Sequence, residues 1–231
     1  MFIISRKRIS LILICFLIGI SVYSYQGMKT GTQERAEETI EEATATPVSG
    51  KVVVLDAGHG TPDEGAQSSK GTTEAETNLK IALKVQNLLE QSGCTVILTR
   101  SDEKAIYDLD KTTLKEKKIS DIRNRVKIGN SASADMFVSI HLNKIPQQQY
   151  WGWQCFYSSK SDESMKLAKI LQSSLNDAIQ KDNKRVAMKL DTVYIMKHVE
   201  IPISIVECGF LSNPEEEQQL LDDEYQDKLA W

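Results

Sequence analysis

The sequence predicts one α/β domain in which a largely parallel, twisted sheet is flanked by helices. Two observations lead to this fold class. Short apolar runs of strand length alternate along the chain with longer segments whose apolar residues recur at helical spacing, and this alternation is typical of parallel sheets covered by helices. The chain has 231 residues, of which 41% are hydrophobic and 26% charged, and this size and composition suit one globular domain with appendages.

The first half of the predicted domain holds three strands joined by two helices. The segment 51–56 is apolar and ends in a glycine-rich turn, which is typical of a buried parallel strand. The first helix places Leu79, Ala82 and Leu83 toward the sheet, and it stops before Gly93. The predicted elements are strands 51–56, 94–99 and 136–140 and helices 74–91 and 119–130.

The second half continues the alternation of strands and helices. The apolar residues of a long predicted helix, among them Ile170 and Leu175, recur at a spacing that directs them inward. The last helix begins after Asn213, a capping residue, with Pro214 in its first turn. The predicted elements are strands 152–157, 193–196 and 203–206, helix 163–179 and a helix from 214 onward.

The amino terminus has the layout of an export signal. Arg6, Lys7 and Arg8 precede an apolar run over 9–20, as in a secretory signal or an uncleaved anchor. No small-residue cleavage site follows, which favours a retained anchor in the membrane with the rest of the chain exported. We therefore predict a signal peptide or signal anchor over 1–25, a flexible linker over 26–50 and the domain over 51–231.

The charge balance argues against a nucleic-acid partner. The net charge is −4, and three of the bases lie in the amino-terminal signal, whereas nucleic-acid binding requires clustered Lys and Arg. The cysteines form no C-x-x-C pair and are too sparse for a disulfide scaffold. We therefore expect no nucleic acid among the partners.

Chemically active side chains stand where the predicted strands end. His59 lies in the turn after the first strand, His141 directly follows the third, and Glu207 directly follows the last. Glu74 begins the helix after the first turn, so it can face the same edge. Ligands of open α/β sheets gather beyond the carboxyl ends of strands, so we expect these four side chains to converge.

These residue types predict a catalytic zinc site. Two histidines and one carboxylate are a donor set of such sites, with a fourth position open for water. A carboxylate that is not a ligand can take a proton from that water. We therefore predict that His59, Glu74 and His141 bind Zn²⁺ and that Glu207 is the base. Asn143 could orient a ligand or bind substrate.

Simpler interpretations exist for single residues of this set. A lone histidine at a strand end is more often a hydrogen-bonded polar residue than a ligand. Glu64 and Glu76 could compete with Glu74 as the carboxylate ligand, and His198 is interpreted as a surface residue.

The choice between Glu74 and Glu76 depends on which side of the helix faces the sheet. Residues two apart point roughly 200° apart on a helix, so both cannot face one metal. If Leu79 and Leu83 are buried, Glu76 shares their side. We keep Glu74 as the ligand, because a residue at the start of the first turn can reach sideways.

Five motifs in one order carry a resemblance to a known family. From about residue 52 to 220 the chain resembles the zinc-dependent N-acetylmuramoyl-L-alanine amidases of type 3, and within them the sporulation-associated CwlD-like branch. The motifs are Asp56-Ala-Gly-His-Gly-Thr-Pro-Asp-Glu-Gly65, Glu74-Ala-Glu-Thr-Asn-Leu79, Arg125-Val-Lys-Ile-Gly-Asn130, Ser139-Ile-His-Leu-Asn143 and Val206-Glu-Cys-Gly-Phe-Leu-Ser-Asn213.

The resemblance implies cleavage of the amide between the lactyl group of muramic acid and the L-alanine of the stem peptide. In the family, the residues matching His59, Glu74 and His141 hold zinc, and the residue matching Glu207 is catalytic. Two departures, Ala57 in place of the usual Pro and Thr61 in place of a frequent Gly, bear on metal affinity more than on chemistry.

The resemblance also implies a setting. It suggests a role in maturation of the spore cortex, with peptidoglycan as the substrate and an exported location in the cell wall or the forespore intermembrane space. No wall-binding repeat is appended, so targeting falls to the amino-terminal segment or to an exported accessory protein. Two alternatives stay open: a non-catalytic, membrane-anchored wall-binding scaffold, and a zinc peptidase that cuts within the stem peptide.

Overall fold

The computed structural model describes residues 48–231. The predicted signal over 1–25 and most of the linker over 26–50 lie outside the described residues, so these two segments stay predictions. Residues 48–50 form a turn that belongs to the domain, because the N–H of Gly50 donates a hydrogen bond to the carbonyl of Gly93. Between Val48 and Trp231, no helix has the length and apolar character needed to cross a membrane.

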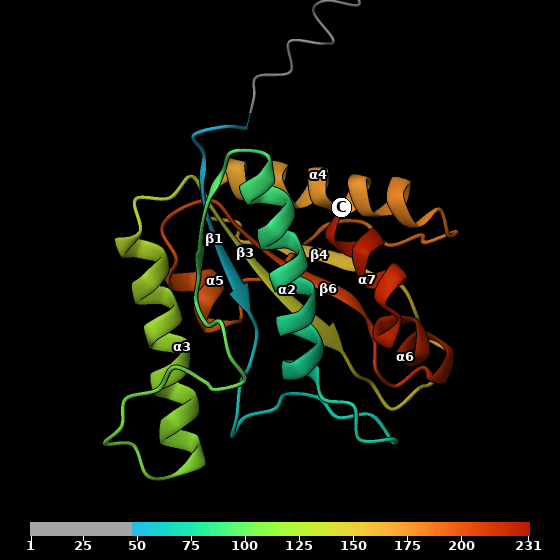
Figure 1. Ribbon diagram of the computed structural model, residues 1–231, viewed down its shortest axis with the longest axis horizontal. Helices are drawn as coiled ribbons and strands as arrows, with labels where there is room; N and C mark the ends of the chain where they lie inside the picture. The colour runs from blue at the N-terminus through green and yellow to red at the C-terminus, as the bar shows by residue number, and fades with distance from the viewer. Residues whose placement is uncertain (1–47) are drawn as a thin grey trace, which may run out of the picture. The chain divides into compact units, whose positions relative to one another are not determined.

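The sheet has six strands in the order β2-β1-β3-β6-β4-β5, and Figure 1 shows its helices packed around it. β1, β2, β3 and β6 are parallel, whereas β4 is antiparallel to β6 and parallel to β5. The carboxyl ends of β1, β3 and β6 therefore share one edge with the beginning of β4. The strands are β1 Val52–Ala57, β2 Thr95–Leu98, β3 Met136–Asn143, β4 Gln154–Tyr157, β5 Met188–Lys189 and β6 Ile203–Phe210.

Helices cover both faces of the sheet and confirm the predicted fold class. Two clusters of buried apolar side chains separate the layers, one under α2, α4 and α7 and the other under α3 and α5. Burial of apolar surface on both sides explains why the inner strands are apolar on both faces. The helices are α2 Glu74–Gln91, α3 Leu114–Ser131, α4 Asp162–Ile179, α5 Tyr194–His198, α6 Pro214–Leu221 and α7 Asp223–Ala230.

Two predicted inward residues face solvent instead. Leu83 in α2 is 40% exposed and Ile170 in α4 is 65% exposed. In α2 the buried side chains include Asn78, Ile81 and Ala82, so the helix is rotated away from the face that Leu83 indicated. An apolar residue next to the buried stripe fits the periodicity nearly as well, and packing against β1 and β3 decides the rotation.

The predicted strand over 193–196 is wrong, since these residues lie in and before the short helix α5. Ile195 and Met196 are both buried while Tyr194 is exposed, and two adjacent buried residues fit a helix but not an alternating strand. A four-residue apolar run does not distinguish the two by periodicity. The neighbouring edge strand β5, with both residues exposed, was not predicted.

The carboxyl-terminal helix begins as predicted but is divided in two. The Asn213 side chain accepts hydrogen bonds from the N–H groups of Glu215 and Glu216, which confirms the cap of α6. The chain leaves the helix at Asp222, whose side chain caps α7 by accepting from the N–H of Tyr225. The break lets α7 pack beside α2 and α4 (Figure 1).

Candidate active site

The loop after β1 brings His59 back toward β3. His59 has a φ of 62°, a left-handed conformation that is uncommon for a residue with a side chain. Two glycines provide the room for this path. A Cβ on Gly58 would lie 2.3 Å from the ring of His141, and one on Gly65 would lie 2.6 Å from Glu74 Oε2.

His59, Glu74 and His141 form a compact cluster of potential metal ligands. One ligand atom from each lies within 4.8 Å of the others. Glu74 Oε1 is 2.9 Å from His141 Nδ1 and 3.3 Å from His59 Nε2. The two imidazole rings stand nearly perpendicular, with centroids 5.1 Å apart. The structure thus brings together the three residues predicted as ligands.

The geometry favours Glu74 over Glu76 as the carboxylate of this cluster. Glu74 is the first residue of α2 and is 4% exposed, and its Oε2 accepts a hydrogen bond from the N–H of Ala66. Glu76 is exposed and pairs with Lys80 at 2.7 Å. The rotation of α2 that exposes Leu83 also turns Glu74 inward, which removes the conflict in the sequence pattern.

Charges within the cluster shift the pKa values of its members. Burial alone would lower the pKa of His59, but hydrogen bonds to Asp63 and Glu74 raise it to about 9. Burial alone would raise the pKa of Glu74, but hydrogen bonds from His141 and His59 hold it well below its usual value. The carboxylates of Asp63 and Glu74 therefore favour a positive charge at the His59 ring.

Glu207 lies beside the cluster without joining it. It stands on β6 directly opposite His141 on β3, so both side chains project from the same face of the sheet. Its Oε2 is buried and has no hydrogen-bond partner among the described residues. Burial raises the pKa of Glu207 to about 7. A carboxyl with such a pKa can accept and release a proton near neutral pH.

The other candidates have separate places. Asn143 is half-buried, lies two residues after His141 on β3 and is opposite Phe210. Glu64 is exposed, and His198 is exposed with a hydrogen bond between its Nδ1 and the carbonyl of Tyr194. Sequence reasoning missed Asp63, whose carboxylate lies 3.2 Å from His59 Nδ1 and orients the ring. Its spacing of four residues from His59 was the available signal.

Two buried arginines and an asparagine hold the loop that carries His59. Arg125 donates to the carbonyls of Ala57 and His59 and forms an ion pair with Asp56 at 2.6 Å. Arg100 donates to the carbonyls of Ala57 and Gly58. Asn78 also donates to the carbonyl of Gly58, at 3.2 Å.

Every carbonyl from Ala57 to His59 therefore has a side-chain donor, which keeps the left-handed His59 in place. Arg125 and Asn78 belong to motifs that carried the family resemblance, but their role in this loop was not predicted. Arg100 had no signal in the sequence beyond its position after a strand.

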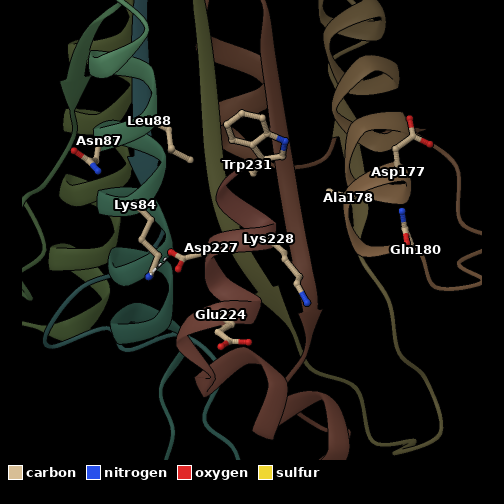
Figure 2. Close-up of a pocket in the computed structure, with 10 residues that line it drawn as sticks. All are labelled: Lys84, Asn87, Leu88, Asp177, Ala178, Gln180, Glu224, Asp227, Lys228 and Trp231. Atoms are coloured by element: carbon tan, nitrogen blue, oxygen red, sulfur yellow. Dashed lines mark hydrogen bonds and ion pairs between the residues drawn. The ribbon is translucent and has the colours of Figure 1, made fainter.

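A cavity of the described domain lies away from the metal-ligand cluster. It has a volume of about 750 Å³ and opens between α2, α4 and α7 (Figure 2). Lys84 there is bound by Asp223 and Asp227. No member of the metal-ligand cluster lines it, and Lys84 is ten residues along α2 from Glu74, or about 15 Å. This cavity is therefore separate from the metal-ligand cluster at the sheet edge.

Fold and site together define a class. An α/β domain with a His/Glu/His cluster at the carboxyl edge of its parallel strands, and a separate half-buried glutamate beside it, has the side chains that metal-dependent hydrolases use. Residues 53–231 match the family described as N-acetylmuramoyl-L-alanine amidase. The chain belongs to this family of peptidoglycan amidases.

Relatives of known kind support the assignment. The germination-specific N-acetylmuramoyl-L-alanine amidase of Bacillus subtilis (strain 168) is 39% identical over 184 residues, which cover 80% of this chain and 77% of that protein. The CwlD amidase from Clostridioides difficile, solved in complex with the GerS lipoprotein, is 42% identical with a TM-score of 0.76, covering 78% of this chain and 93% of that one.

A second solved structure shows the same fold at lower identity. The N-acetylmuramoyl-L-alanine amidase from Clostridium difficile 630 is 29% identical with a TM-score of 0.67, covering 78% of this chain and 90% of that chain. These likenesses confirm the predicted family and its CwlD-like branch.

Proposed function

We propose that this amidase is zinc-dependent, that His59, Glu74 and His141 hold the zinc, and that Glu207 moves the proton during hydrolysis. The observation that carries the proposal is the gathering of three ligand atoms within 4.8 Å beside a buried carboxylate oxygen that has no hydrogen-bond partner within residues 48–231. Two imidazoles and one carboxylate match a donor set of catalytic zinc and leave a position open.

The residues of the site have different roles in the proposed hydrolysis. Zinc, when bound, polarises the amide carbonyl and lowers the pKa of water. Asp63 orients His59 through Nδ1, so that its Nε2 faces Glu74. Glu207 takes the proton of the attacking water and passes it to the amine of L-alanine as the amide bond breaks. The raised pKa of Glu207, about 7, suits both transfers.

The biological setting is part of the same proposal. The names of the relatives motivate a role in spore peptidoglycan, where removal of stem peptides prepares the cortex for germination. The complex solved for the C. difficile relative motivates an exported accessory protein as partner. In this proposal residues 1–25 direct export and anchor the chain in the membrane. The linker and the domain then lie outside the membrane, where the peptidoglycan is.

The test separates metal binding from proton transfer. Glu207→Gln should retain zinc and lose hydrolysis by about 10²- to 10⁴-fold, because it removes the proton acceptor and leaves the ligands intact. Glu76→Gln is the matched control, since Glu76 is exposed on the same edge, and it should keep both zinc and activity. Loss of zinc from Glu207→Gln would instead make Glu207 a ligand.

The products identify the reaction. Mass spectrometry of digested peptidoglycan should show released stem peptides that begin with L-alanine. Shortened stems would indicate a peptidase, and an unchanged wall would indicate a scaffold. Either of these results would refute the proposed cleavage.

A further inference from the structure

We infer that Arg185 is an anion-binding residue that recognises a carboxylate on the peptide part of the substrate. This inference rests on the proposed function of the neighbouring site. Arg185 lies in the loop before β5. Within residues 48–231 its guanidinium forms no ion pair, whereas the neighbouring Lys184 and Lys189 each pair with an aspartate. Glu216, the carboxylate whose charge it influences, is engaged by the N–H groups of Gly152 and Phe210.

Topology places this loop at the catalytic edge. β4 runs antiparallel to β6, so its first residue, Gln154, lies opposite Glu207. β5 is parallel to β4, so the loop before β5 also meets that edge. Figure 1 shows β4 next to β6 in the sheet. Adjacent strands are about 4.8 Å apart, so Arg185 stands roughly 10 Å from the strand of Glu207.

The guanidinium of Arg185 contacts two residues that are strand partners of residues at the catalytic edge. Its NH1 donates to Gln154 Oε1 at 3.2 Å, and Gln154 is the cross-strand partner of Glu207. Its Cζ lies 4.8 Å from the centre of the Phe210 ring, and Phe210 is the cross-strand partner of Asn143. The guanidinium of Arg185 therefore contacts one residue that pairs with Glu207 on β6 and one that pairs with Asn143 on β3, the strand of His141.

These contacts fix the guanidinium without neutralising it. A third contact, from Nε to the carbonyl of Trp151 at 3.2 Å, completes a set of partners that are a carbonyl, an amide and an aromatic face. All three are uncharged. A guanidinium offers more donors than these contacts use, and its planar fork suits a carboxylate. A preorganised Arg beside an active site, with no ion pair to any described residue, is thus suited to an anionic ligand.

The chemical structure of the substrate indicates which of its carboxylates can bind to Arg185. The lactyl carboxyl is consumed in the scissile amide, so the sugar side offers no carboxylate next to the reacting bond. The peptide side does, at the α-carboxyl of the residue after L-alanine when that residue is linked onward through its side chain. An extended chain spans about 3.3 to 3.6 Å per residue, so this carboxylate lies roughly 7 Å from the scissile bond, within reach of Arg185.

Binding measurements that do not depend on turnover test the inference. The background is zinc-loaded Glu207→Gln, and the probes are N-acetylmuramoyl-L-alanyl-D-glutamate and its α-amide. We expect the acid to bind roughly 10- to 100-fold more tightly than the amide, the range of a hydrogen-bonded charge pair. Adding Arg185→Met should remove this preference by weakening the acid alone.

Two further variants sharpen the result. Lys184→Met removes a neighbouring exposed charge, paired with Asp182, and should leave the preference intact. Arg185→Lys should retain only part of it, because the ammonium lacks the planar fork. Equal affinities for acid and amide, or equal weakening of both by Arg185→Met, would overturn the inference. Hydrolysis by the wild type is measured separately, so failure of the proposed function is recognised independently.

Discussion

Replacing Arg125 by methionine should show how much a buried charge network contributes to the stability of this domain. Arg125 is 3% exposed, and it forms ion pairs with two buried carboxylates, those of Asp56 (1% exposed) and Asp121 (8% exposed). Methionine keeps much of the side-chain volume, but within residues 48–231 it leaves Asp56 with the hydroxyl groups of Thr99 and Ser139 as its only side-chain partners. Removing one partner of a buried ion pair costs about 3 to 5 kcal/mol, a large part of the stability of a domain of this size.

A second substitution separates the charge from the packing. Arg125→Met/Asp56→Asn removes the more deeply buried of the two stranded carboxylates and leaves Asp121, so it should be about 2 kcal/mol more stable than Arg125→Met alone. Arg123→Met, an exposed site on the same helix, should change stability by less than about 0.5 kcal/mol. Urea unfolding at pH 7 measures all three variants against the wild type.

The difference in unfolding free energy between the wild type and Arg125→Met should depend on pH in a defined direction. Burial alone would raise the pKa of Asp56, but Arg125, Ser139 and Thr99 hold it below its usual value. The network therefore stabilises the wild type above about pH 4 and less so as the pH falls through the low folded pKa. In Arg125→Met the stranded Asp56 takes up a proton more readily, so the stability gap should narrow between pH 7 and pH 4.

Two outcomes would refute this reasoning. One is a stability difference between the wild type and Arg125→Met that is the same at pH 7 and pH 4. The other is a double variant that is no more stable than Arg125→Met. Either would assign the lost stability to packing rather than to the uncompensated charge of Asp56. Zinc titration provides a separate check, because both variants lack the donor to the His59 carbonyl and should bind zinc more weakly than the wild type.

Three other predictions concern the catalytic edge. Glu74→Ala should abolish zinc retention while Glu76→Ala keeps most of it, and a metal titration at neutral pH showing the reverse would move the ligand to Glu76. Gly58→Ala should weaken zinc binding and hydrolysis together, because the added Cβ would lie 2.3 Å from the His141 ring; wild-type zinc affinity would contradict this. In metal-free protein, Glu207→Gln should match wild-type stability at pH 4 and exceed it by about 3 kcal/mol at pH 8, because the wild type carries a folded pKa of about 7 against about 4.3 unfolded. That advantage grows as the pH rises between these two values, and urea unfolding that shows no such growth would mean that Glu207 ionises freely.

The sequence by itself determined the α/β class, the inner strands and the convergence of the active site. The apolar runs of β1, β3 and β6 identify buried parallel strands, and parallel strands place the residues that follow them at one edge. His59, His141 and Glu207 could therefore be brought together without coordinates. The order of the motifs then indicated the family.

Tertiary structure decided what depends on contacts between distant segments. The face of α2 that turns Glu74 inward is set by packing on β1 and β3, since local periodicity allows a neighbouring face. The helical state of α5 follows from the burial of Ile195 and Met196 together. The antiparallel placement of β4, which brings Arg185 to the catalytic edge, and the pairing of Arg125 with Asp56 across 69 positions have no local signal. Such arrangements depend on long-range register and on which polar groups become partners when buried, and only the folded chain specifies these.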